Sequence, residues 1–317
     1  MAADWIAAAG GREAVLDRAL GAYLGLALGD ALGATVEFMT RREIIARFGV
    51  HRRIVGGGWL KLEPGQVTDD TTMSLALGDA LLLGAHEGRP HDTRLIADAY
   101  VAWWRGKPVD CGNTCRRGIQ RYLREGSLEG VCSDGDGGNG ALMRNLPAVL
   151  ATLADDEAFE RVSIAQAHVT HHHPLSDAAV LGLGQVVRAQ VKGGDAGVSA
   201  ALVDQLVAAV PAFRYKPYPG RASGYVVDTV QTVLHFFRAH DDFEAAVVGA
   251  VNQGDDADTT GALVGMLAGA RCGASALPRA WLSRLKPEVH RAITEQAAAL
   301  VAIALAGPSS APCSHSP

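Results

Sequence analysis

A glycine repeat inside the most apolar stretch of the chain constrains the fold more than any other feature. The stretch is LGAYLGLALGDALGATVEF, residues 20–38, and glycine recurs in it at every fourth position: Gly21, Gly25, Gly29 and Gly33. Residues four apart share one face of an α-helix, and glycine lets a neighbouring backbone approach that face closely. The stretch is about long enough to cross a membrane. Asp30 in its middle and Glu37 near its end argue against that, so we expect a central helix in a water-soluble fold.

The rest of the chain also reads as helical. Hydrophobic residues make up 48% of the 317 residues but aromatic residues only 6%, so the apolar content is mostly Ala, Leu and Val, which is typical of closely packed helices. Alternating strand patterns are nearly absent, which predicts an all-α fold. A Gly-rich loop is expected at residues 51–66 and a disordered tail at 307–317. Further helices are predicted at residues 70–85, 93–104, 115–124, 141–153, 157–167, 176–191, 198–210, 226–240, 243–251, 259–270 and 287–305.

Charge and cysteine content exclude several classes of function. The net charge of -5 gives no general attraction to nucleic acid or to anionic membranes. The first residues, MAADWIAAAGG, lack the basic and apolar regions of a secretory signal. Five cysteines without a framework spacing fit a reducing compartment. We therefore expect a cytoplasmic protein that does not bind nucleic acid, and we expect a monomer.

Two segments place paired acids and threonines directly before apolar helical stretches. They are TDDTT at residues 68–72 and DDADTT at residues 255–260. Helix capping explains one such motif, since Asp and Thr are favoured N-caps and acids suit the first helical turn. Five carboxylates exceed what two caps require, and neither motif contains a Lys or Arg to offset their repulsion. The pattern therefore predicts a two-metal site for Mg²⁺ or Mn²⁺ rather than zinc, because the ligands on offer are oxygen atoms.

Seven segments taken together resemble the ADP-ribosylglycohydrolase family. They follow the family's order from about residue 20 to about residue 305, so the resemblance covers nearly the whole chain. Each segment alone is a weak signal, whereas seven in register are specific. The segments are GLALGDALGATVEF, GQVTDDTTM, VDCGNTCRRGI, GDGGNGALMR, THHHPLSDAA, SGYVVDTVQTVLHFF and NQGDDADTTGALVGMLAGA.

The resemblance implies a single-domain hydrolase, a compact orthogonal multi-helix bundle over residues 1–306, with two divalent cations that are usually Mn²⁺ and alternatively Mg²⁺. Within the family the pattern is most similar to the enzymes of nitrogen-fixation control, which remove ADP-ribose from an arginine of dinitrogenase reductase. The resemblance further implies regulation by a PII-type nitrogen-signalling protein and reversible membrane association through an ammonium channel.

The family's functional positions can be carried over to this chain. The implied metal ligands are Thr68, Asp69, Asp70, Asp256, Asp258 and Thr259. The implied catalytic residues are Glu37 and Asp110. The implied substrate-binding residues are Asn113, Gly138, Asn139, Gly140, Arg144, His171 and Tyr225. Of the other histidines, His168, His172 and His173 are expected at the surface or in packing.

The chemistry of the bond fits these residue types. Breaking the bond between the anomeric carbon of a ribose and a guanidinium nitrogen builds positive charge on the sugar, as in glycoside hydrolysis. Glu37 would act as general acid and base. Asp110 would pair with the guanidinium or stabilise the sugar cation, and the sequence leaves both roles open. The GDGGNG segment supplies backbone N–H groups suited to a pyrophosphate.

One residue departs from the family pattern. Asp255 stands where the family has a glycine before Asp256. Five carboxylates and Glu37 would exceed the charge of two divalent cations, so we expect Asp255 to point away from the metals.

Three other functions remain to be separated from this one. The acceptor could be a serine or a small molecule instead of an arginine. The chain could bind ADP-ribose without catalysis, although Glu37 and both acidic segments are retained. A generic two-metal phosphohydrolase would explain the acidic motifs but not the other segments.

Overall fold

The computed structural model describes residues 2–306, and within them it is helical without a strand. Three isolated backbone bridges are the only β-type pairing in this range. The helices are α1 (Ala2–Ala8), α2 (Arg12–Gly33), α3 (Arg41–Phe48), α4 (Asp69–His86), α5 (Thr93–Arg105), α6 (Asn113–Glu125), α7 (Gly140–Met143), α8 (Leu146–Ala151), α9 (Asp156–His168), α10 (Pro174–Val191), α11 (Ala196–Ala209), α12 (Val226–Ala239), α13 (Phe243–Val251), α14 (Ala257–Cys272), α15 (Arg279–Leu282) and α16 (Pro287–Ala306). Short 3-10 turns lie at Asp134–Asp136, Pro211–Phe213 and Ala274–Ala276. The prediction of an all-α fold is confirmed.

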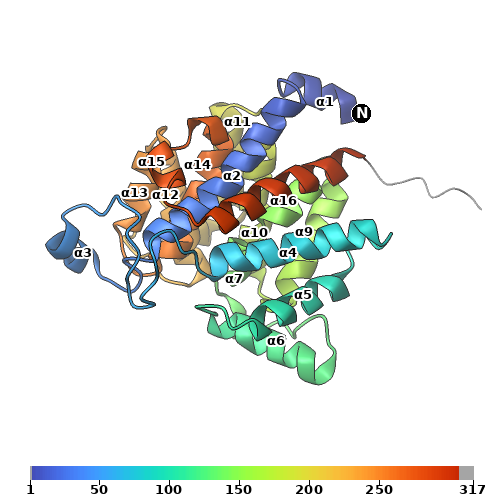
Figure 1. Ribbon diagram of the computed structural model, residues 1–317, viewed down its shortest axis with the longest axis horizontal. Coiled ribbons are helices and arrows are strands. Elements are labelled where there is room, and N and C mark those ends of the chain that lie inside the picture. The colour runs from blue at the N-terminus through green and yellow to red at the C-terminus, as the bar shows by residue number, and fades with distance from the viewer. Residues whose placement is uncertain (1, 307–317) are drawn as a thin grey trace, which may run out of the picture.

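The glycine stripe brings α2 and α14 into backbone contact. A Cβ atom added to Gly25 would lie 2.2 Å from the carbonyl oxygen of Gly265, and one added to Gly265 would lie 2.1 Å from that of Gly25. The same close approach recurs along both helices, so side chains larger than hydrogen are excluded there. Figure 1 shows α2 crossing the middle of the molecule, with α14 beside it. The predicted central helix is therefore confirmed, and α14 is the backbone that approaches it.

The C-terminal helix α16 lies between α2 and α4 (Figure 1). Its Gln296 accepts a hydrogen bond of 2.6 Å from the Tyr23 hydroxyl of α2 and donates one of 2.7 Å to Asp79 of α4. Among the described residues, α16 is the one helix that is long and apolar enough to cross a membrane by length and composition alone. Buried apolar side chains of all three helices belong to one contiguous core. The tail expected at residues 307–317 lies outside the described residues.

Helix α2 ends earlier than the sequence suggested. The apolar stretch runs to residue 38, but the helix ends at Gly33 and Glu37 lies in the turn that follows. Phe38 adopts a left-handed backbone conformation, with φ of 60°, and its N–H donates to the carbonyl of Asp255 at 2.7 Å. This pairing with the segment before α14 turns the chain away from the helix axis.

The expected helix over residues 141–153 is also wrong in part, because the structure divides it into α7 and α8. Pro147 lies in the first turn of α8. A proline has no N–H to donate to the carbonyl four residues earlier, here that of Met143, and its ring clashes with that carbonyl. Continuous helix through this position is therefore unfavourable.

Candidate active site and metal centre

The two acidic motifs meet at the N-termini of α4 and α14. The hydroxyl of Thr259 donates to Asp70 Oδ2 at 3.1 Å, which joins the motifs across 189 residues. Glu37, in the turn after α2, completes the cluster. Carboxylate oxygens of Glu37, Asp256 and Asp258 all lie within 4.8 Å of one another. The predicted convergence of these segments is therefore present.

Helix capping does not account for the acids of these motifs. Neither Thr68, the N-cap of α4, nor Asp256, the N-cap of α14, makes a side-chain capping hydrogen bond. The start of α4 is instead held by Asp30 of α2. This buried carboxylate accepts the N–H of Thr68 through both oxygens at 3.1 Å and the hydroxyl of Thr71 at 2.5 Å. At α4 a residue from another helix therefore does the capping, so Asp69 and Asp70 are not needed as caps.

The cluster is buried, and no Lys or Arg within residues 2–306 forms an ion pair with it. Asp69, Asp70 and Asp258 are each at most 5% exposed. Burial, followed by the charge of Asp110, raises the pKa of Asp69 to about 7. Burial and neighbouring carboxylates likewise hold the pKa values of Asp70 and Asp258 well above their usual range. Unpaired carboxylates in such a place are unfavourable, so the site requires protons or cations.

Glu37 has the same electrostatic environment. Burial raises its pKa to about 8; a hydrogen bond of 2.6 Å from the Trp59 indole N–H opposes this rise, and the charges of Asp256 and Asp110 add to it. Trp59 comes from the Gly-rich loop before α4, which the sequence correctly predicted as a loop. The indole fixes one carboxylate oxygen of Glu37 and leaves the other free.

The donor set fits a hard divalent cation. Asp70 Oδ1 is buried and has no hydrogen-bond partner within the part of the chain that the structure describes. The groups that converge here are carboxylates and threonine hydroxyls, which are the ligands that Mg²⁺ and Mn²⁺ prefer. These acids therefore form a candidate metal site.

A cavity of about 310 Å³ opens over the acids. Of the residues that the sequence assigned to the site, its walls include Glu37, Asp69, Asp110, Asn113, Gly138, Asn139, Gly140, His171, Asp256, Asp258 and Thr259. Thr68 and Asp70 are buried beneath these walls. No Lys or Arg is among the described residues that line the cavity. Its inner surface is therefore suited to cations and to sugar hydroxyls.

The segment assigned to the pyrophosphate forms one wall, but its backbone is partly engaged. The Asn139 N–H donates to the carbonyl of Gly224 at 3.1 Å, and α7 is only four residues long. Asn139 Nδ2 donates to Asp256 Oδ2 at 2.5 Å, so this residue connects the wall to the acids. A Cβ at Gly140 would lie 2.9 Å from the His171 ring, which explains the glycine there. One N–H of this segment is therefore engaged, and contact of the segment with a pyrophosphate stays a prediction.

The position of Arg144 differs from the one that was predicted. It is fully buried outside the cavity, with its guanidinium 4.4 Å from the ring centre of Tyr100. Its Nη2 donates to Thr170 Oγ1 at 2.8 Å, and that oxygen lies 2.7 Å from Nδ1 of His171. The expected contact of Arg144 with substrate is therefore corrected to support of His171. Burial, and then the charge of Arg144, holds the pKa of His171 well below its usual range, so this ring is neutral.

Tyr225 lies at the edge of the site rather than in the cavity wall. It is 45% exposed and its backbone forms a bridge with Gly138. A Cβ at Gly137 would lie 3.2 Å from its ring, so the aromatic side chain borders the same wall as Asn139. Its contact with a nucleotide stays a prediction.

The remaining histidines lie apart from the acids. The rings of His168 and His172 stack at 3.7 Å, and both contact Glu129. His168 also lies 3.1 Å from Asp177, and His172 Nδ1 lies 2.6 Å from the carbonyl oxygen of Gly130, so hydrogen bonding accounts for this group without a metal. Asp255 is exposed, has φ of 58° and does not line the cavity, as expected from its charge.

Comparisons with known proteins identify the family. The family model for ADP-ribosylglycohydrolases matches residues 11–309. The chain is 52% identical to ADP-ribosyl-[dinitrogen reductase] glycohydrolase of Rhodospirillum rubrum, over 92% of this chain and 97% of that protein. It is 33% identical to an ADP-ribosylarginine hydrolase of Serratia proteamaculans, over 85% of this chain and 75% of that protein. A solved structure described as an ADP-ribosylglycohydrolase-related protein complex superposes with a TM-score of 0.80 at 33% identity, covering 92% of this chain and 99% of that one. The chain belongs to the ADP-ribosylglycohydrolase family.

Proposed function

We propose that this protein removes ADP-ribose from an ADP-ribosylated arginine of dinitrogenase reductase and so reverses that modification. The observation that carries the proposal is the cavity lined by Glu37 and buried, uncompensated carboxylates, with Asp110 in its wall. The Rhodospirillum rubrum relative, at 52% identity, supports the protein substrate. The Serratia proteamaculans relative supports arginine as the acceptor.

The proposal includes two divalent cations, Mn²⁺ in preference to Mg²⁺. The residues that would hold them are Thr68, Asp69, Asp70, Asp256, Asp258 and Thr259, together with Glu37. When bound, such cations supply Lewis acidity to water and to the vicinal hydroxyls of a ribose. The partner-free oxygen of Asp70 and the absence of a counter-charge among the lining residues support this assignment.

Glu37 would move the proton in the reaction. Hydrolysis breaks the bond between the anomeric carbon and the guanidine nitrogen, joins a water oxygen to that carbon and delivers a proton to the leaving nitrogen. A carboxyl with a raised pKa can give up a proton near neutral pH and take one from water. The Trp59 indole would hold the carboxyl group in place during both transfers.

The other walls would bind and orient the substrate. Asp110 is placed to attract the positive guanidinium or the positive charge that develops on the sugar. Asn113 and the neutral His171 present hydrogen-bonding groups to the same space. The wall at Gly138 and Asn139 would border the pyrophosphate.

The cellular setting forms part of the same proposal. Family resemblance alone supports its three features. They are a cytoplasmic location, reversible association with the membrane through an ammonium channel, and control by a PII-type regulator.

One experiment separates this function from the alternatives. Purified protein with Mn²⁺ is incubated with ADP-ribosylated arginine, ADP-ribosylated serine and a phosphate ester. We expect release of ADP-ribose from the arginine conjugate only, and a loss of turnover of about 10²-fold or more in Glu37→Gln with ADP-ribose binding retained. Preferential hydrolysis of the serine conjugate or of the ester would contradict the proposal. Binding of ADP-ribose without any turnover would identify a non-catalytic relative.

A further inference from the structure

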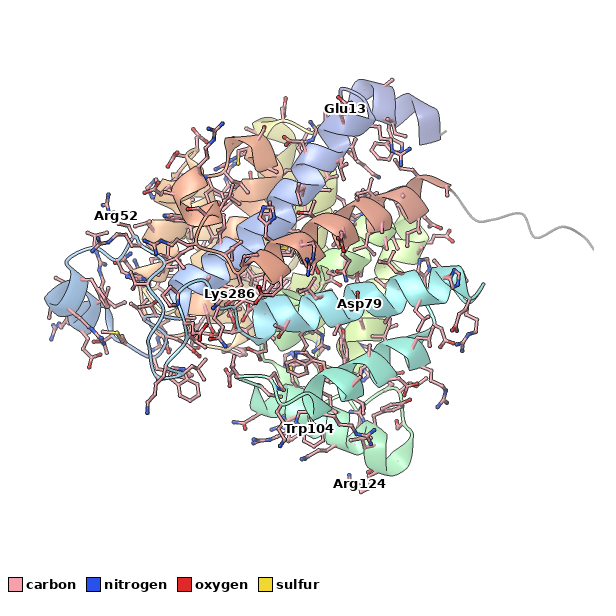
Figure 2. All side chains as sticks on the ribbon, viewed as in Figure 1. Glu13, Arg52, Asp79, Trp104, Arg124 and Lys286 are labelled. Carbon is pink, nitrogen blue, oxygen red and sulfur yellow. The ribbon has the colours of Figure 1, made fainter. Side chains whose placement is uncertain are left out.

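A second hollow adjoins the catalytic cavity and is basic. It measures about 500 Å³ and lies between the end of α5 and the first turn of α6. Trp104, Arg105, Lys107 and Arg116 line it, and Asp110 is its single acidic residue. Figure 2 shows Trp104 where α5 and α6 lie close together. Asp110 also lines the catalytic cavity, so the two hollows share that residue.

This second hollow forms a basic groove, and its three cationic side chains are available to a ligand. Arg105, Lys107 and Arg116 are all exposed, and none forms an ion pair within residues 2–306. Arg116 makes one side-chain hydrogen bond, to Asn113 Oδ1 at 2.6 Å. Exposed cations gathered around a hollow with a single acid attract an anionic group.

Two of these cationic residues lie at positions where the local backbone disfavours their residue type. Arg116 lies in the first turn of α6, which contains no acid, although the helix dipole favours negative charge there. Lys107 follows the end of α5 with φ of 57°, a left-handed conformation that favours glycine over lysine. Residues that oppose local preferences are expected at functional sites.

We propose that this basic groove binds an acidic polypeptide segment beside the modified arginine of the protein substrate. The inference rests on the proposed function, because Asp110 marks the end of the cavity at which the arginine would enter. The chain as a whole carries a net charge of -5 and repels acidic proteins at long range. A local basic groove at the entrance therefore selects substrates in which Asp or Glu residues lie close to the arginine.

The test uses three substrates that differ in size and in charge. They are free ADP-ribosylarginine, a peptide with ADP-ribosylarginine flanked by glutamates, and the same peptide with glutamine at each glutamate position. At low ionic strength we expect kcat/KM for the acidic peptide to exceed that for the glutamine peptide by about tenfold, chiefly through KM, because the groove does not touch the reacting atoms. Salt at 0.5 M should remove most of this preference, because it screens exposed charges.

The groove variant is Arg105→Glu with Lys107→Glu. It should abolish the preference for the acidic peptide and leave turnover of free ADP-ribosylarginine within about twofold. Its matched control is Arg12→Glu with Arg238→Glu, two exposed arginines that give the same change of charge. Arg238, like Arg105, lies in the last turn of its helix. Arg12 begins α2 and lies beside Glu13, at the opposite end of the view from Trp104 (Figure 2).

Three results would overturn the assignment. The first is an equal kcat/KM for the two peptides in the unsubstituted protein. The second is an equal decrease in the preference for the acidic peptide in the groove variant and in its control. The third is a decrease in kcat/KM for free ADP-ribosylarginine in the groove variant that equals its decrease for the acidic peptide. The last would show that the cations act on ADP-ribose itself. Calorimetric binding of the two peptides without ADP-ribose tests the groove separately. Absence of any hydrolysis would then refute the proposed function, while selective binding of the acidic peptide still supported the groove.

Discussion

The packing of α2 on α14 predicts that a methyl group added at Gly33 weakens metal binding, although Gly33 itself is not a ligand. A Cβ on Gly33 would lie 2.1 Å from the carbonyl oxygen of Ala257 and 2.5 Å from the Cα of Asp258. Ordinary contact is about 3.4 Å, so Gly33→Ala must displace this turn of α14 by roughly 3.4 − 2.1 = 1.3 Å. Metal ligands tolerate errors of about 0.2 Å. We therefore expect Mn²⁺ to bind at least about 10–100-fold more weakly, although Gly33 contributes no ligand.

Gly21→Ala is the matched control for this prediction. It introduces a similar clash, 2.4 Å from the carbonyl oxygen of Gly269, at the other end of the same helix pair. Both substitutions should cost about 1–3 kcal/mol through overpacking, offset in part by about 1 kcal/mol of gained helix propensity. Only Gly33→Ala should lose affinity for Mn²⁺, measured by isothermal titration calorimetry on protein whose helical circular dichroism is intact. Equal loss of affinity in both variants, or retained affinity in Gly33→Ala, would refute the reasoning.

Three further outcomes follow from the site. Raised carboxyl pKa values, about 8 for Glu37 and about 7 for Asp69, mean that the folded metal-free protein binds protons more tightly than the unfolded chain. Its stability should therefore fall as pH rises from about 5 to 8, and the increase in Tm on adding Mn²⁺ should be larger at pH 8 than at pH 5, as measured by thermal denaturation with and without chelator. Asp255→Gly should leave the Mn²⁺ stoichiometry unchanged and activity equal or higher, whereas loss of one bound ion by calorimetry would place Asp255 among the ligands. Asp30→Asn should cost about 1–3 kcal/mol in denaturant titrations and weaken Mn²⁺ binding, because an amide N–H would face the N–H donors that begin α4; unchanged metal affinity would limit Asp30 to folding.

Local patterns predicted most of the helices because their causes are local. The expected helix over residues 243–251 coincides with α13, and that over 226–240 exceeds α12 by one residue. Helix α3 was not predicted, although its signal is present in the sequence. Thr40 and Glu43 form a capping box, with the Thr40 N–H donating to Glu43 Oε2 at 2.7 Å. That helix has only one buried residue, so apolar periodicity does not reveal it.

The contacts that shape the site depend on residues far apart in sequence. Arg144 follows the segment that forms a cavity wall, which suggested contact with substrate, but the break between α7 and α8 directs it into the core. Trp59 gave no signal beyond its place in a Gly-rich loop, and its bond to Glu37 spans 22 residues. Such positions follow from the packing of helices rather than from any short motif.

Asp30 shows most directly how the fold produces the site. In the sequence it served only as evidence against a membrane span. In the structure it lies on the same helix as the glycines that admit α14, and it holds the first turn of α4 through Thr68 and Thr71. Helix α2 therefore contacts the starts of both acidic helices. It packs against α14 at glycines, which have no side chain, and it holds α4 through the carboxylate of Asp30. Because these two contacts set the distance between the motifs, the glycine-rich stretch that constrains the fold also determines whether the acids can share cations.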